Sequence, residues 1–368
     1  MTPAVDVAGE VGVPAGTPID GVLFDLDGVV YHGPDAIPGA VDGIADLHER
    51  DIPVGYVTNN ATRTAEVVAD HISALGIPTA TTVVITSAQV LAARLSEEFG
   101  TGAPILLVGT TGLREALESE GLKIVGSLDD SPVALAQGLD PHIDYAGIVR
   151  AAEAITAGLD WWATNPDFSM VGPASRVPGN GAFVDMLAQL TGRTPHIVGK
   201  PSPDVMTHAG HRLGARRPLM VGDRLDTDIE GANRAGFDSA LVLTGVHDLH
   251  DALAADPIRR PAFVLPTLAG LPRVLEAAVC GHRTEVGGPN PANPLGSVTT
   301  NRAERTAEPG PGTHAAGRRV QIVDGKLQLA EAALTSPEAI EAALRLAWAA
   351  IDSGERIAPG NLPRRIDD

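Results

Sequence analysis

Short apolar runs alternate with amphipathic stretches along most of the chain up to Cys280. Runs of four to eight apolar residues are typical of buried strands, and apolar positions three and four apart are typical of helices. Strict alternation of the two predicts an α/β fold around a parallel sheet. The predicted strands are 21–27, 53–57, 83–85, 104–109, 132–138, 161–163, 197–199, 218–222, 239–243 and 262–265, and the predicted helices are 38–50, 64–75, 87–99, 111–120, 144–157, 180–191, 203–213, 226–235 and 267–278.

Beyond Cys280 the pattern changes. Residues 281–317 are crowded with Gly, Pro, Asn and Thr and show no periodicity, which is typical of a flexible linker. After it the sequence predicts a hairpin across Asp324-Gly325 and then a helix opened by Ser336-Pro337, with one apolar face made by Ile340, Leu344, Trp348 and Ile351. This ββα segment is small for an independent core, so we expect it to dock on the main body or on another subunit.

Polar residues that can carry chemistry stand where predicted strands end. Asp25 and Asp27 close the first strand, Thr58 closes the second, Lys200 follows the run 197–199, and Asp223 follows the run 218–222. In an open α/β sheet the carboxyl ends of the strands form the ligand-binding edge, so these side chains should meet there. Two neighbouring carboxylates repel, and a cation between them or a proton on one of them relieves the repulsion. The set predicts a nucleophile, an acid/base, phosphate-binding groups and a Mg²⁺ site, as phosphoryl transfer requires.

The four motifs, in this order, resemble the haloacid dehalogenase superfamily of phosphohydrolases. The spacing narrows the resemblance to the NagD-type branch, subfamily IIA, because the long gap before Lys200 has room for an inserted cap and the gap before Thr58 does not. Other matching segments are Ala163-Thr164-Asn165-Pro166-Asp167, Ser175-Arg176-Val177-Pro178-Gly179, Gly199-Lys200-Pro201-Ser202-Pro203 and Thr227-Asp228-Ile229. The resemblance implies a Rossmann-like core and a C2-type α/β cap. The expected organisation is a disordered leader (1–18), a catalytic core (19–87 and 195–278), the cap (88–194), a flexible linker (279–318) and a small C-terminal module (319–368).

Each motif residue is expected to have a distinct role. Asp25 is the predicted nucleophile that forms an aspartyl-phosphate, and Asp27 is the predicted general acid and base. Thr58, Asn59 and Lys200 are predicted to bind the phosphoryl group. Asp25 and Asp223 are predicted carboxylate ligands of Mg²⁺, and the resemblance implies that the Asp27 backbone carbonyl is a further ligand. Asp228 is predicted to orient a metal-bound water or Lys200, and Asp226 is predicted only to cap a helix.

The composition limits the classes of partner and the cellular location that we expect for this protein. The net charge of −19 argues against a nucleic-acid partner, which would need a basic surface, and the site must therefore supply local positive charge itself. No apolar run is long enough for a transmembrane helix. The single cysteine excludes an internal disulfide and favours a reducing cytoplasm. The resemblance implies a possible homodimer.

The predicted function is Mg²⁺-dependent hydrolysis of a small cytoplasmic phosphate monoester. A lysine-poor, alanine- and arginine-rich composition indicates a GC-rich actinobacterial source, which together with the resemblance favours glycerol 3-phosphate. Phosphoglycolate, pyridoxal phosphate and nucleoside monophosphates stay open, with Arg63, His142 and Arg176 as the predicted specificity residues. A phosphomutase is disfavoured because its cap lies between the first two motifs. A silent or regulatory binding protein acting through the C-terminal segment is the alternative of another class.

Overall fold

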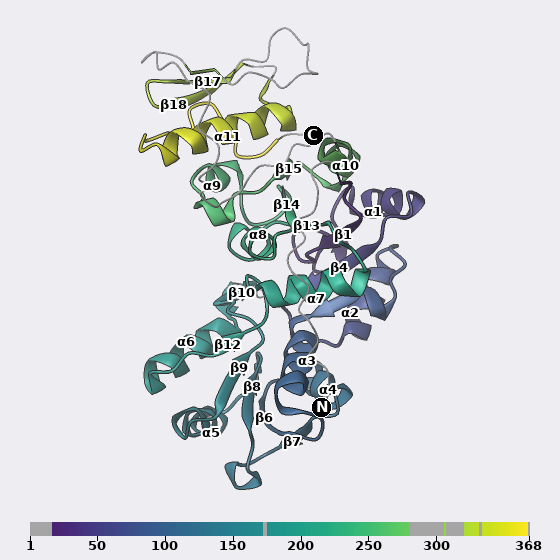
Figure 1. Cartoon of the computed structure of the whole chain (residues 1–368), viewed down its shortest axis with the longest axis vertical. Coiled ribbons are helices and arrows are strands. Elements are labelled where there is room, and N and C mark those ends of the chain that lie inside the picture. Colours follow the sequence, from purple (N-terminus) through teal and green to yellow (C-terminus); the bar gives the residue numbers. More distant parts are fainter. Residues whose placement is uncertain (1–16, 172–174, 280–304, 307–319, 331–332, 367–368) are drawn as a thin grey trace, which may run out of the picture.

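The computed structural model describes residues 17–171, 175–279, 305–306, 320–330 and 333–366. Figure 1 shows three parts stacked along the long axis of the molecule: a central sheet with its helices, a second α/β unit below it, and the C-terminal module above it. The predicted leader lies almost wholly outside the described residues. So does most of the predicted linker, of which only Val279, the last residue of α10 (Leu271–Val279), and the short strand β16 (Arg305–Thr306) are described.

The central sheet is parallel throughout and has the strand order β15-β14-β13-β1-β4-β5. Its strands are β1 (Gly21–Phe24), β4 (Val54–Thr58), β5 (Val84–Thr86), β13 (Pro218–Gly222), β14 (Asp238–Val242) and β15 (Phe263–Leu265). Strand β1 pairs with both β4 and β13 and is completely buried, which explains its uninterrupted apolar run.

Helices cover both faces of this sheet. Side chains along β1 alternate between the two faces of the sheet, so that Val22 and Phe24 lie in one apolar cluster and Leu23 lies in another. The first cluster is completed by α1 (Ala40–Glu49), α2 (Ala65–Ala74) and α10 (Leu271–Val279), and the second by α3 (Ser87–Phe99), α7 (Pro203–Leu213) and α8 (Glu230–Arg234). Two of the helix starts are fixed by their sequence. Thr86 and Gln89 form a capping box at α3, and Ser202 caps α7 with Pro203 in its first turn.

The second unit contains a parallel sheet of order β12-β9-β8-β6-β7. In the chain it lies between β5 and β13 of the central sheet. Its strands are β6 (Pro104–Val108), β7 (Lys123–Val125), β8 (Ala134–Gln137), β9 (Asp160–Ala163) and β12 (His196–Ile197), with helices α4 (Thr111–Ser119), α5 (Tyr145–Thr156) and α6 (Asn180–Thr191). The insertion predicted from the long gap before Lys200 is therefore a folded α/β unit with its own sheet.

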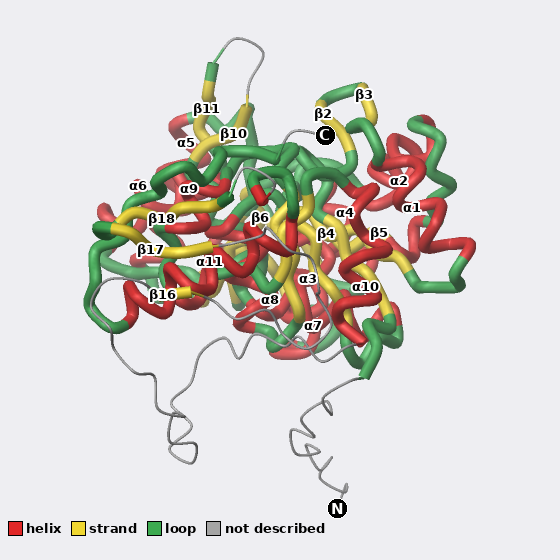
Figure 2. Tube along the Cα trace, turned by 90° about the horizontal axis from the view of Figure 1, so that it is seen from above, coloured by secondary structure: helices red, strands yellow, loops and turns green. Residues whose placement is uncertain are grey.

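Two hairpins flank the carboxyl ends of the sheets. They are β2–β3 (Tyr31–His32 with Asp35–Ala36) and β10–β11 (Ser169–Val171 with Arg176–Pro178). Figure 2 shows that both project from the same side of the molecule. The hydrophobic pattern predicted neither hairpin, because strands of two or three residues are too short to show a period. The remaining short elements are η1 (Thr81–Val83), η2 (Leu128–Asp130), the π-helical turn η3 (Leu225–Ile229), α9 (Leu249–Leu253), η4 (Pro257–Arg259) and η5 (Leu268–Gly270).

The C-terminal module docks on the edge of the central sheet. It consists of the hairpin β17–β18 (Val320–Val323 and Lys326–Leu329), to which β16 adds a strand, and helix α11 (Pro337–Asp352). The turn residues Asp324 and Gly325 both have positive φ, as the predicted two-residue hairpin requires. Apolar residues of α11, among them Trp348, share one cluster with Val264 of β15 and Leu249 of α9. The C-terminal module was expected to dock either on the main body or on another subunit, and in the structure it docks on the main body.

Candidate active site

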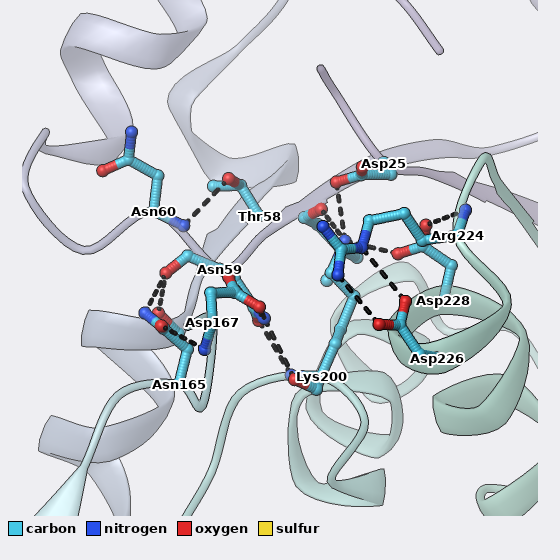
Figure 3. A network of polar contacts seen from close by, with 12 residues as sticks. Asp25, Thr58, Asn59, Asn60, Asn165, Asp167, Lys200, Arg224, Asp226 and Asp228 are labelled. Carbon is cyan, nitrogen blue, oxygen red and sulfur yellow. Dashed lines mark hydrogen bonds and ion pairs between the residues drawn. The ribbon is translucent and has the colours of Figure 1, made fainter. Parts of the chain in front are cut away.

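The carboxyl ends of three central strands bring the predicted motif residues together, and Figure 3 shows Asp25, Thr58 and Lys200 among them. Asp25 directly follows β1, Thr58 is the last residue of β4, and Asp223 directly follows β13. Lys200 lies between β12 and α7, where the chain returns from the inserted unit. The sequence separation between these residues exceeds any local effect, so the parallel sheet itself assembles the site.

Lys200 is the centre of the polar network. Its side chain is only 4% exposed, and its Nζ lies 2.6 Å from Asp25 Oδ1 and 2.7 Å from Asp228 Oδ1. It also donates to the Val57 carbonyl at 3.3 Å. Burial by itself would lower the pKa of Lys200, but the facing carboxylates of Asp228 and Asp25 raise it above its ordinary value. A fixed ammonium therefore bridges Asp25, at the end of β1, and Asp228, in the π-helical turn η3.

Three carboxylates form a cluster with the geometry of a cation site. One oxygen from each of Asp25, Asp223 and Asp228 lies within 4.8 Å of the others. Asp223 Oδ2 accepts a hydrogen bond from the Val246 amide at 2.7 Å, while its Oδ1 is buried without a hydrogen-bond partner. Burial, followed by the negative charges of Asp228 and Asp25, raises the pKa of Asp223. A hard divalent cation bound by carboxylate oxygens would satisfy the unpaired oxygen and remove the repulsion, so the donor set fits Mg²⁺.

Glycines make room for the Asp223 carboxylate. A Cβ atom on Gly28 would lie 2.6 Å from Asp223 Oδ2, and one on Gly245 would lie 2.0 Å from the same atom. Gly28 also has φ of +87°, which favours glycine on conformational grounds. The backbone at Gly28 and at Gly245 thus packs against the Asp223 carboxylate and determines its position.

Asp27 lies apart from the cluster. Strand β1 ends at Phe24 rather than at Asp27 as expected, because the chain turns at Gly28 to form the β2–β3 hairpin. The Asp27 side chain is 81% exposed and lies 3.9 Å from His32 Nδ1. Despite this exposure its pKa is raised, first by the protein atoms that limit its hydration and then by the Asp25 carboxylate. Asp27 is therefore placed to hold a proton beside Asp25 rather than to complete the carboxylate cluster.

Thr58 and Asn59 occupy the turn after β4. The Thr58 hydroxyl accepts from the Asn60 amide at 3.1 Å and does not cap a helix, since α2 is capped by Thr64. The Asn59 side chain accepts from the Lys200 amide at 2.8 Å and donates to the Lys200 carbonyl at 3.0 Å. The paired hydrogen bonds lock the Lys200 backbone against the end of β4.

The inserted unit contributes two residues for which no role was predicted from the sequence. Asn59 Nδ2 lies 3.1 Å from Asp167 Oδ2, and Asn165 Nδ2 donates to the Asn59 carbonyl at 2.7 Å. Burial, opposed by the hydrogen bond from Asn59, raises the pKa of Asp167. The signal available in the sequence was the polar run Thr-Asn-Pro-Asp directly after a strand, the same pattern that identified the other motifs.

The weaker sequence predictions have mixed outcomes. Arg63, His142 and Arg176 are all exposed, and no hydrogen bond or ion pair of the described residues joins any of them to the cluster around Lys200. Of the three, Arg63 lies close enough for its charge to lower the pKa of Asp27 in part.

The prediction that Asp226 caps a helix is wrong. Its carboxylate pairs with Arg224 at 2.9 Å, because the chain enters the helix through the π-turn η3, where no side chain caps the first turn.

Comparison with known proteins agrees with this geometry. Residues 22–123 match the family model of haloacid dehalogenase-like hydrolases, and residues 197–271 match a second model of hydrolases of this type. The chain is 42% identical over 245 residues to D-glycerol 3-phosphate phosphatase of Mycobacterium tuberculosis, covering 67% of this chain and 69% of that protein.

Solved structures extend the similarity. The crystal structure of glycerol phosphate phosphatase from Mycobacterium tuberculosis in complex with calcium has a TM-score of 0.73 and 34% identity, over 92% of this chain and 91% of that one. A structure of that phosphatase in complex with magnesium has a TM-score of 0.71 over 90% of both chains. The thermostable NPPase of Geobacillus stearothermophilus, in a double mutant, has a TM-score of 0.63 and 33% identity, over 68% of this chain and 97% of that one. The chain therefore belongs to the haloacid dehalogenase-like hydrolases, within their NagD-type phosphatases, and is a phosphoric monoester hydrolase.

Proposed function

We propose that this phosphatase hydrolyses glycerol 3-phosphate through an aspartyl-phosphate on Asp25, with Mg²⁺ as cofactor. The observation that carries the proposal is the buried ammonium of Lys200, held between Asp25 and Asp228 beside the unpaired carboxylate oxygen of Asp223. A nucleophilic carboxylate next to a fixed cation and a cation-binding cluster is what displacement at a phosphate ester needs.

In the first step an Asp25 carboxylate oxygen attacks phosphorus and the ester P–O bond breaks. The leaving alkoxide takes the proton of Asp27, whose raised pKa keeps a proton available at higher pH than an ordinary aspartate does. The exposed position of Asp27 beside the sheet edge gives its carboxyl access to the departing group. The products of this step are the free alcohol and a phosphorylated Asp25.

In the second step the Asp27 carboxylate accepts a proton from water while the water oxygen attacks the phosphorus of the aspartyl-phosphate. The bond between phosphorus and the Asp25 oxygen breaks, which releases inorganic phosphate and restores both residues. Throughout, Thr58, the Asn59 backbone amide and Lys200 are proposed to hold the phosphoryl oxygens. The site needs its own hydrogen-bond donors and positive charge, because the protein as a whole carries a net charge of −19 and repels an anionic substrate.

The proposed Mg²⁺ ligands are the carboxylates of Asp25 and Asp223 and the backbone carbonyl of Asp27. When bound, the ion supplies positive charge that stabilises the charge developing on the phosphoryl oxygens. Asp228 is proposed to act through its contacts: it orients Lys200 by an ion pair at 2.7 Å and accepts from the Arg224 amide at 3.1 Å. The magnesium complex of the Mycobacterium tuberculosis phosphatase supports the choice of ion.

Glycerol 3-phosphate is proposed over other esters for two reasons. The relative with 42% identity is a D-glycerol 3-phosphate phosphatase. In addition, residues 279–368 make up about a quarter of this chain, so the match that covers 92% of it extends into the C-terminal region, whereas the NPPase match covers 68%. Phosphoglycolate, pyridoxal phosphate and nucleoside monophosphates are the alternatives that the test must separate.

Several further expectations belong with this proposal. We infer that the unit inserted between β5 and β13 serves as the cap, within residues 88–194, over a core formed by 19–87 and 195–278. Arg63, His142 and Arg176 are proposed to contribute to substrate choice. A cytoplasmic location is supported by the single cysteine, and a homodimer and the lack of a nucleic-acid partner stay predictions. In the described part of the chain no helix combines the length and apolar character needed to cross a membrane.

The test is release of inorganic phosphate from glycerol 3-phosphate, phosphoglycolate, pyridoxal phosphate, a nucleoside monophosphate and p-nitrophenyl phosphate in Mg²⁺ buffer. Wild type is compared with Asp25→Asn and with Asp46→Asn, which changes a half-buried carboxylate on α1 that pairs with Arg50, outside the candidate site. We expect the highest kcat/KM for glycerol 3-phosphate. Asp25→Asn should no longer release phosphate, and Asp46→Asn should release it as the wild type does. A higher kcat/KM for another ester overturns glycerol 3-phosphate as the proposed substrate. Phosphate release by Asp25→Asn equal to that of the wild type overturns Asp25 as the proposed nucleophile.

A further inference from the structure

One loop of the core contacts the acidic cluster at Asp223. Residues 243–248, here named the β14 loop, follow β14 and lead into α9. The Val246 amide donates to Asp223 Oδ2 at 2.7 Å, and the His247 amide donates to the Asp223 carbonyl at 3.1 Å. The Thr244 hydroxyl donates to the Gly28 carbonyl at 2.7 Å. The β14 loop therefore determines both where the Asp223 carboxylate stands and how it meets the turn after Asp27.

The C-terminal end of the described chain holds this loop. The Arg365 guanidinium donates to the Gly245 carbonyl at 2.7 Å and also to the Leu243 carbonyl. Next to it, the Arg364 carbonyl accepts from the Leu249 amide at 2.9 Å, and the Arg364 side chain pairs with Asp248 at 2.5 Å. Two arginines in succession thus hold both ends of the loop that positions Asp223.

The segment that carries the arginines packs on the docked module, because Leu362 and Ile366 share one apolar cluster with residues of α11. The His250 ring contacts the Leu362 carbonyl at 2.9 Å, and the Trp348 indole donates to the Ala252 carbonyl at 3.0 Å. Arg260 pairs with Asp352 at the far end of α11 through two contacts of 2.6 and 2.7 Å. Contacts therefore run without a break from α11 through the C-terminal arginines and the β14 loop to the carboxylate of Asp223.

We propose that Arg365 is a positioning residue for the metal site, through which docking of the C-terminal module and binding of Mg²⁺ are coupled. The planar guanidinium fixes two carbonyls of the β14 loop at once, so that the Val246 amide faces Asp223 Oδ2 and leaves Oδ1 for the ion. Because coupling between two binding events is reciprocal, Mg²⁺ also tightens the docking of residues 362–366. The inference rests on the magnesium site of the proposed function.

The test is calorimetric titration of Mg²⁺ into the full chain, without substrate. Arg365→Gln removes the fork and is expected to weaken Mg²⁺ binding about tenfold, which corresponds to about 1.4 kcal/mol. Arg365→Lys keeps a charge that reaches one carbonyl and is expected to recover part of the loss. Arg216→Gln is the matched control, because it makes the same substitution at an exposed arginine whose ion pair is with Asp20 and not with the β14 loop. It should bind Mg²⁺ as the wild type does.

Two further readouts separate positioning from general loosening. Hydrogen exchange of wild type should slow in the segments 243–249 and 362–366 when Mg²⁺ is added. In Arg365→Gln, kcat should return toward the wild-type value at saturating Mg²⁺. Unchanged Mg²⁺ affinity of Arg365→Gln, or an equal loss in Arg216→Gln, overturns the inference and leaves the proposed function standing. A wild type that binds no Mg²⁺ overturns the magnesium site and the inference together.

Discussion

Replacing Asp223 by asparagine should stabilise the metal-free protein and remove its response to Mg²⁺. Asp223 shares a 4.8 Å cluster with Asp25 and Asp228, and Lys200 pairs directly with the latter two. An asparagine keeps an oxygen for the Val246 amide and has nearly the same shape. The substitution therefore removes one negative charge and little else.

The size of the effect follows from the geometry. Two unit charges 4.8 Å apart repel by about 3.5 kcal/mol at an effective dielectric constant of about 20. Asp223 faces two such charges, while Lys200 and partial protonation offset much of the repulsion, so we expect a net gain of about 2–3 kcal/mol. A gain of this size raises the melting temperature by roughly 5–10 °C in a domain of this size.

The gain depends on pH with a definite sign. Burial, then Asp228 and Asp25, raise the pKa of Asp223 to about 8 in the folded protein. The folded state therefore binds more protons than the unfolded state between about pH 4, the ordinary carboxyl range, and pH 8. Stability of the metal-free wild type attributable to this group is present at low pH and is lost as pH rises through this window. The advantage of Asp223→Asn should accordingly be larger at pH 8 than at pH 6.

The assay is thermal unfolding in EDTA at pH 6 and pH 8, repeated with a Mg²⁺ series. Mg²⁺ at 100 times its dissociation constant should stabilise wild type by about 2.7 kcal/mol and leave Asp223→Asn unchanged. Asp226→Asn is the matched control, because Asp226 lies three residues away and pairs with Arg224 at the surface. A lower melting temperature for metal-free Asp223→Asn, or a wild-type response of this variant to Mg²⁺, would refute the reasoning.

Two other changes test contacts of the fold. Asn59→Ala removes the bonds that lock the Lys200 backbone and reach Asp167, and it should lower kcat by about 5- to 150-fold, as a loss of about 1–3 kcal/mol implies. Asn60→Ala, which changes only an exposed local turn, should retain wild-type kcat; equal kcat for the two variants contradicts the role of Asn59. Trp348→Ala empties a buried site between α11 and α9 and should cost about 3–5 kcal/mol in unfolding, with Trp348→Phe clearly milder. A calorimetric scan in which both variants melt like wild type would show that the module is not docked in solution.

Much of this protein is determined locally in the sequence. The buried run before Asp25 predicts a central strand because only a strand covered on both faces is apolar at every position. The Asp324-Gly325 pair predicts its hairpin because both residues tolerate positive φ. The motif residues could be identified for the same reason: each follows directly on an apolar strand, and parallel strands bring their carboxyl ends to one edge.

Tertiary structure alone decided which of these groups touch. The sequence places Asp27 beside Asp25, but its side chain is exposed, and the carboxylate that joins Asp25 and Asp223 in the cluster is that of Asp228, two hundred residues away. The polar run that contains Asp167 marks it as a candidate, but its contact with Asn59, like that of Arg365 with the Gly245 carbonyl, forms only after separate units have docked. Periodicity reports the neighbours of a residue along one strand or helix. Contacts between units depend on how whole elements pack, and that information is spread over the entire chain.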